Sequence, residues 1–208
     1  TVLGEGDNRR AEWTKREAEG EQSLYYSAQL VESDSDGASA PAAVLPSKEY
    51  NNYWEEAQEL AAKEVLELAR EKSSSPLSLT RELIKLLNSP SSQNAGLLRS
   101  DTLGQAELLI HFLNRADIPA RYVMGLYLED ARRRQVLTPM VEIYTKQEWL
   151  LVNPKTGDIG VPPNLLLWHR GGVSVLDVSG GKNSRVHFSM IRQTVPAAQL
   201  AQVTKSDS

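Results

Sequence analysis

Apolar residues recur at helical spacing in three segments between residues 48 and 114. In residues 48–72 they alternate with Glu and Lys, which predicts a long amphipathic helix. Pro76 suits the first position of a second helix that extends to about residue 88, and a third helix is predicted over residues 102–114. The Ser-, Asn- and Gly-rich residues 89–100 are predicted to form a loop.

The period changes from helical to alternating after the third helix. Alternation predicts three strands, over residues 120–128, 136–145 and 148–152. Asn and Pro introduce a turn directly after the third strand. Residues 173–178 and 185–194 suggest a final hairpin.

The N-terminal residues give a separate signal. After a polar, frayed start, alternation near Leu24 with Gly20 at the turn predicts a β hairpin over residues 12–31, and residues 32–46 have the composition of a linker. We therefore expect three regions: residues 1–46 (hairpin and linker), 47–195 (main domain) and 196–208 (polar tail). Helices followed by antiparallel strands indicate an α+β fold. Whether the hairpin belongs to the main domain stays open.

Composition excludes several classes of function. The 208 residues include no cysteine, so a cysteine nucleophile, a disulfide and a thiolate metal site are all excluded. The formal net charge of -4 argues against nucleic acid as a partner. No run of about 18 apolar residues occurs, so the sequence predicts no membrane-spanning helix. Because the chain starts with Thr1, we expect it to be an excised segment of a longer protein.

Residues 102–154 carry the most specific motifs of the chain. They contain Asp117-Ile118-Pro119-Ala120-Arg121, then Thr138-Pro139-Met140-Val141-Glu142-Ile143, then Trp149 and Asn153-Pro154. This segment resembles the core of the transglutaminase-like superfamily, which has a papain-like fold. In that family a helix begins with the catalytic cysteine and ends in a Gly-Ile-Pro-Ala-Arg type of loop. A strand then carries the catalytic histidine, and the next strand ends in Asp-Pro.

The resemblance implies that this chain has lost the catalytic triad. By the family's spacing the cysteine, histidine and aspartate positions fall on Thr102, Thr138 and Asn153. A threonine hydroxyl gives no accessible anion, and Thr138 cannot act as a base near neutral pH. Gln105 three residues after Thr102 also forms a capping-box pattern, so we expect Thr102 to cap the helix. The resemblance therefore implies a pseudoenzyme that needs no cofactor.

Other residues could still form a binding groove. If the fold is that of the family, Thr102, Gln105, Thr138 and Asn153 would converge as neutral hydrogen-bonding groups near Trp149, and could hold a peptide or amide without cleaving it. Alternation along the strand places Thr138 on the same face as the candidate ligand-binding residues Met140 and Glu142. Equally, these groups could satisfy one another in a closed groove, with Arg121 and Glu142 forming only a structural pair.

Metal binding and threonine catalysis are weaker alternatives. His111, His169 and His187 are far apart in sequence and lack zinc-site spacing. An acidic stretch within residues 32–46 lacks the closing glutamate of a calcium loop, because Ala43 stands there. We therefore expect no metal. A cryptic threonine-dependent amidase or acyltransferase would need Thr102 and a base that the sequence does not supply nearby.

One branch of the superfamily matches the missing triad, namely inactive transglutaminase domains fused to a seven-helix membrane bundle in bacteria. The resemblance implies a soluble domain on the periplasmic face of the inner membrane. Its partners would be the membrane region of the same polypeptide and other membrane or periplasmic proteins. The first hypothesis is that the domain binds or senses a peptide-like ligand. The alternative is a structural or protein–protein assembly module, which predicts an exposed apolar patch or self-association.

Overall fold

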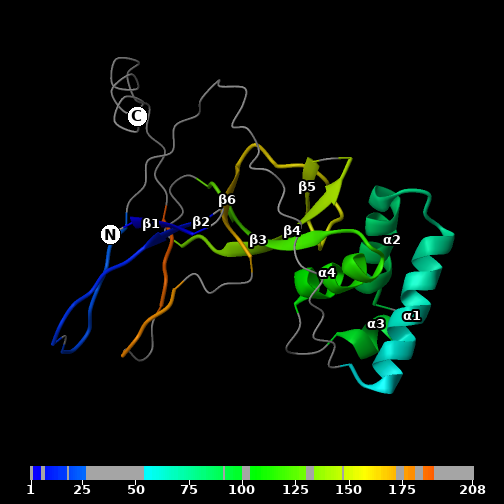
Figure 1. The fold of residues 1–208 in the computed structure, drawn as a ribbon, viewed down its shortest axis with the longest axis horizontal. Coiled ribbons are helices and arrows are strands. Elements are labelled where there is room, and N and C mark those ends of the chain that lie inside the picture. Colours follow the sequence, from blue (N-terminus) through cyan, green and yellow to red (C-terminus); the bar gives the residue numbers. More distant parts are fainter. Residues whose placement is uncertain are drawn as a thin grey trace, which may run out of the picture. The chain divides into compact units, whose positions relative to one another are not determined.

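The computed structural model describes residues 2–5, 8–17, 19–26, 54–90, 92–99, 104–129, 134–146, 148–171, 176–180 and 185–189 (Figure 1). The chain divides into two compact units. The first comprises Thr1–Ala42 with Ile191–Ser208, and the second comprises Ala43–Met190.

A two-stranded hairpin forms the described regular structure of the first unit. Strand β1 (Val2–Glu5) pairs antiparallel with β2 (Asn8–Ala11). The hairpin predicted over residues 12–31 is not found in its described part, because residues 12–17 and 19–26 hold no strand and the strands lie in the segment expected to be frayed. Residues 27–31 lie outside the described residues. The alternation near Leu24 was misleading. Leu24, Tyr25 and Tyr26 are 60%, 89% and 55% exposed, so successive residues there do not divide into a buried and an exposed face.

Local capping chemistry explains the helices of the second unit. Helix α2 (Pro76–Asn88) has the predicted bounds, because Pro76 occupies its first turn and the Ser75 hydroxyl accepts from the Ser78 amide. Helix α1 (Glu56–Glu71) begins later than predicted, with Glu55 as its N-cap residue. Residues 48–53 lie outside the described residues.

Helix α3 (Gln93–Leu98) lies where the sequence predicted only a loop. The Ser92 hydroxyl caps it by accepting from the Ala95 amide at 3.1 Å. The helix is too short to show an apolar period, yet Ala95 and Leu98 are fully buried. Helix α4 (Gln105–Arg115) confirms most of the third predicted helix.

The sheet has four antiparallel strands in the order β5-β4-β3-β6. Strands β3 (Ala120–Tyr127), β4 (Leu137–Thr145) and β5 (Glu148–Val152) form the predicted meander. Strand β6 (Leu165–Arg170) was not predicted and pairs with β3 at the opposite edge. The predicted final hairpin is not seen in the described residues 176–180 and 185–189, which hold only an isolated bridge between Phe188 and Gln135.

Two apolar clusters lie on the two faces of this sheet. On one face, α4 packs on β3 and β4, α2 packs on α4, and α1 packs on α2 and α3 (Figure 1). Val141 and Ile143 of β4 belong to this larger cluster, which also contains Phe112 and Leu109. The second cluster lies on the other face of the sheet and contains Val123, Met140, Leu151 and Leu165. The fold is therefore α+β, as predicted.

Candidate functional site

Helix α4 begins three residues after the position that the family's spacing gives for the nucleophile. Gly104 is the N-cap residue, and its amide donates to the Glu107 carboxylate at 3.0 Å. The predicted cap at Thr102 with Gln105 is therefore wrong, because Glu107 supplies the capping side chain and Gln105 is the first helical residue. Thr102 itself lies outside the described residues.

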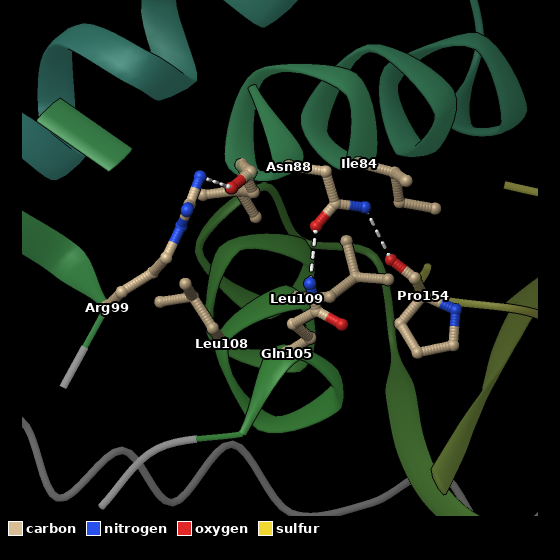
Figure 2. A pocket seen from close by; sticks show the side chains of 8 residues that line it. Ile84, Asn88, Arg99, Gln105, Leu108, Leu109 and Pro154 are labelled. Carbon is tan, nitrogen blue, oxygen red and sulfur yellow. Dashed lines mark hydrogen bonds between the residues drawn. The ribbon is translucent and has the colours of Figure 1, made fainter. Parts of the chain in front are cut away.

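Asn88 connects three elements at the N-terminus of α4. Its side-chain oxygen accepts from Gln105 Nε2 at 2.9 Å, and its Nδ2 donates to the carbonyls of Pro154 and Lys155 at 2.9 and 3.0 Å (Figure 2). The last residue of α2 is thereby joined to the first residue of α4 and to the turn after β5. Asn88 thus uses both ends of its amide within the protein.

Arg99 closes the end of α2 beside this junction. Its Nη2 donates to the carbonyls of Leu87 and Ser89, each at 2.9 Å, and so satisfies oxygens at a helix C-terminus. The hollow between these groups has a volume of about 10 Å³, which is room for about one water molecule. The described part of the candidate cleft is therefore largely filled by the protein's own side chains.

Asn153, at the family's aspartate position, forms a local turn. Its Oδ1 accepts from the amides of Lys155 and Thr156 at 2.9 and 3.4 Å. Its own amide donates to the Asp158 carbonyl at 2.9 Å, and Gly157 completes the turn with φ of +79°. The side-chain oxygen that would orient a catalytic partner is thus used to shape the turn after β5.

Thr138 lies on the opposite face of the sheet from α4. It pairs with Gly125 and shares a face of β4 with Met140 and Glu142, as the alternation predicted. Val141 and Ile143, which alternate with them, belong to the cluster that contains α4. The expected convergence of Thr138 with Gln105 is therefore not what the described geometry shows. Met140 is only 1% exposed, so it is a core residue.

A second group of polar side chains lies on the other face of the sheet, around Glu142. Arg121 Nε donates to Glu142 Oε2 at 2.7 Å, and Arg170 donates to the two Glu142 oxygens at 3.0 and 3.3 Å. The guanidinium of Arg121 also lies 4.0 Å from the centre of the Trp149 ring. The predicted structural pair of Arg121 and Glu142 is confirmed. Arg170 was missed, because it is on the strand that the sequence did not predict.

Trp149 is held by packing on this face. Its ring contacts Tyr144 with a centroid distance of 5.3 Å, and its buried Nε1 has no acceptor among the described residues. The buried Glu142 carboxylate, its two partly exposed arginines and the indole therefore form one polar group on this face. None of them faces the Asn88 junction, so the residues predicted for one groove lie in two separate groups.

The three histidines do not form a site together. His111, in α4, stacks on Trp54 with a centroid distance of 5.6 Å, and burial together with nearby Arg115 lowers the pKa of its imidazole. His169 pairs with Met124 in the sheet, and His187 is exposed. The described residues contain no group of three or more His, Asp or Glu side chains that could hold a metal ion.

One comparison with known proteins matches a family model. Residues 1–102, just under half of the chain, match the family model described as an inactive transglutaminase fused to 7 transmembrane helices. This confirms the family resemblance. The match covers the N-terminal residues, whereas the motifs that suggested the family begin where it ends. No curated protein and no solved structure gives a significant match, so the papain-like core has no structural relative to support it.

The family description adds two coarse statements about function. It names the transglutaminase as inactive, and it places the domain in a polypeptide with membrane helices. Within the described residues, no helix is both long enough and apolar enough to cross a membrane.

Proposed function

We propose that this domain is a non-catalytic assembly module of a membrane-fused protein, in which the position of the former active site serves as a structural junction. The observation that carries the proposal is the set of three hydrogen bonds made by Asn88. They join α2, α4 and the turn after β5 at the start of the helix on which the family's nucleophile would stand. A binding site for a peptide would leave such amides available to the ligand.

The chemistry of the triad positions supports the same proposal. By the resemblance, Thr102, Thr138 and Asn153 replace the nucleophile, base and orienting acid, and none carries a charge near neutral pH. The Asn153 oxygen is bonded within its own turn, and Thr138 is on the far face of the sheet. Acyl transfer needs the nucleophile and its base within hydrogen-bond reach of each other.

A ligand screen tests the proposal. Wild type, Gln105→Trp and the control Gln93→Trp, which changes an exposed glutamine of α3, are unfolded thermally with peptides, amino acids and cell-wall fragments. A ligand at about one hundred times its Kd adds about 2.7 kcal/mol, or roughly 5–10 °C for a chain of this size. We expect no ligand to shift any of the three proteins. A wild-type shift that is lost in Gln105→Trp and kept in Gln93→Trp would replace this proposal with ligand binding.

Peptide or amide binding is the second candidate because of Gln105. Its side chain is exposed at the first position of α4, where backbone amides also point outward, and only its nitrogen faces Asn88 (Figure 2). A threonine-dependent amidase is the third possibility. It requires turnover that disappears in Thr102→Ala.

We also propose that the domain faces the periplasm, as the resemblance implies. The family's fusion to membrane helices supports a position beside a membrane but leaves the side open. Protease digestion of the membrane-fused protein in spheroplasts decides the side. Cleavage in intact spheroplasts supports the periplasm, and cleavage only after lysis contradicts it.

A further inference from the structure

Exposed apolar side chains gather in a short segment of the first unit. Trp13, Leu24, Tyr25 and Tyr26 are 49%, 60%, 89% and 55% exposed. Trp13 and Tyr26 contact each other edge to face, with ring centroids 6.3 Å apart, so the first and last of these four residues lie side by side. We call these four residues the aromatic tip.

Three of the four side chains of the tip are amphipathic rather than purely apolar. Trp and Tyr combine a large ring with a polar N–H or O–H, and they concentrate where apolar and aqueous phases meet, above all at the surface of a bilayer. A protein that remains in water gains nothing from keeping such side chains exposed as a group, since exposed apolar groups of this kind mark interaction sites.

The charge around the tip indicates which surface it fits. Residues 8–26 contain four basic and four acidic side chains, so the segment is neutral overall. A neutral segment is neither drawn to anionic lipids nor repelled by them, and it suits zwitterionic headgroups. Polar contacts near the tip, such as the one from Lys15 to Gln22, also occur within the segment itself.

We propose that the aromatic tip contacts the zwitterionic surface of the bilayer in which the family's membrane helices are embedded. The matched residues 1–102 include the whole tip. This inference rests on the proposed position of the domain beside a membrane.

Co-sedimentation of the 208-residue chain with phosphatidylcholine vesicles tests the proposal. We expect binding of the wild type that changes little with salt, and roughly tenfold weaker binding for Leu24→Ser with Tyr25→Ser. The matched control, Leu60→Ser with Leu68→Ser, removes leucines of α1 that are 60% and 42% exposed and should bind as the wild type does. Because all four substituted side chains are exposed, we expect each variant to fold, and circular dichroism checks that it does.

Three outcomes would overturn the proposal. The first is that the wild type does not bind the vesicles. The second is that the α1 control loses as much binding as the tip variant. The third is self-association without vesicles that disappears in the tip variant, which would assign the tip to a second copy of this chain. None of these outcomes affects the Asn88 junction, so failure here is distinguishable from failure of the proposed function.

Discussion

Glu142 gives the strongest stability prediction, because its carboxylate is buried between two cations. Glu142→Ala leaves Arg121 and Arg170 without the carboxylate that receives three donors at 2.7, 3.0 and 3.3 Å. Removing one partner of a fully buried ion pair costs about 3–5 kcal/mol. The side chains of the two arginines are 18% and 32% exposed, so water can reach both in part. We therefore expect the lower end, a loss of about 3 kcal/mol.

Urea unfolding followed by far-ultraviolet circular dichroism measures this loss, since the described helices all lie in the second unit with Glu142. Glu142→Gln keeps the shape but not the charge, and we expect it to cost about 1.5 kcal/mol, because charge-assisted hydrogen bonds are about twice as strong as neutral ones. The control is Glu59→Ala, which breaks an ion pair with Arg115 in which Glu59 is 49% exposed. An exposed pair should contribute less than about 1 kcal/mol. Equal losses for Glu142→Ala and Glu59→Ala would refute the reasoning.

Three further variants test local details of the structure. Asp117→Gly should stabilise the protein by about 0.5 kcal/mol in the same urea assay. The reason is that Asp117 has a φ of +61° at the end of α4, where the family's motif has glycine. A destabilised variant would mean that the contacts of the aspartate side chain contribute more than the relief of backbone strain. Because the folded-state pKa of His111 is lowered, stability should be complete above about pH 6.5 and should fall as the pH drops below it, and His111→Gln should remove this slope. The measurement is the change in unfolding free energy between about pH 7 and about pH 5. An equal change in the wild type and in His111→Gln would contradict this prediction. Gly125→Ala should cost about 1 kcal/mol, since its Cβ would lie 2.9 Å from Leu165 Cδ1 in a buried cluster; an unchanged melting temperature would mean that Leu165 moves freely.

Elements with their own local signals could be predicted from the sequence. Helix α2 has a serine cap and a proline at its start, and β5 is bounded by turns, so both match the predicted bounds. Helix α3 and strand β6 lack such signals. Helix α3 is shorter than two turns, and β6 is recognised only by its pairing with β3. That pairing depends on residues far away in the sequence.

The candidate site was predictable only as a set of residues. The motif correctly paired Arg121 with Glu142, because both are fixed by neighbouring strands in register. It did not reveal Asn88, whose role depends on how α2, α4 and the turn after β5 meet. In the sequence, an asparagine at this position indicates only that a helix ends there. The error at Thr102 arose similarly, since two capping patterns overlap and the one with Glu107 is used.

The unfolding free energy of Asn88→Ala tests the central claim most directly. If the start of α4 is a structural junction, the variant should lose about 2 kcal/mol, because three hydrogen bonds disappear and the carbonyl of buried Pro154 is left without its donor. Asn94→Ala is the matched control. It removes one exposed hydrogen bond to Glu64 and should cost less than about 0.5 kcal/mol. If Asn88→Ala proves as stable as the wild type, or more stable, its amide is held ready for a ligand and the junction account is wrong.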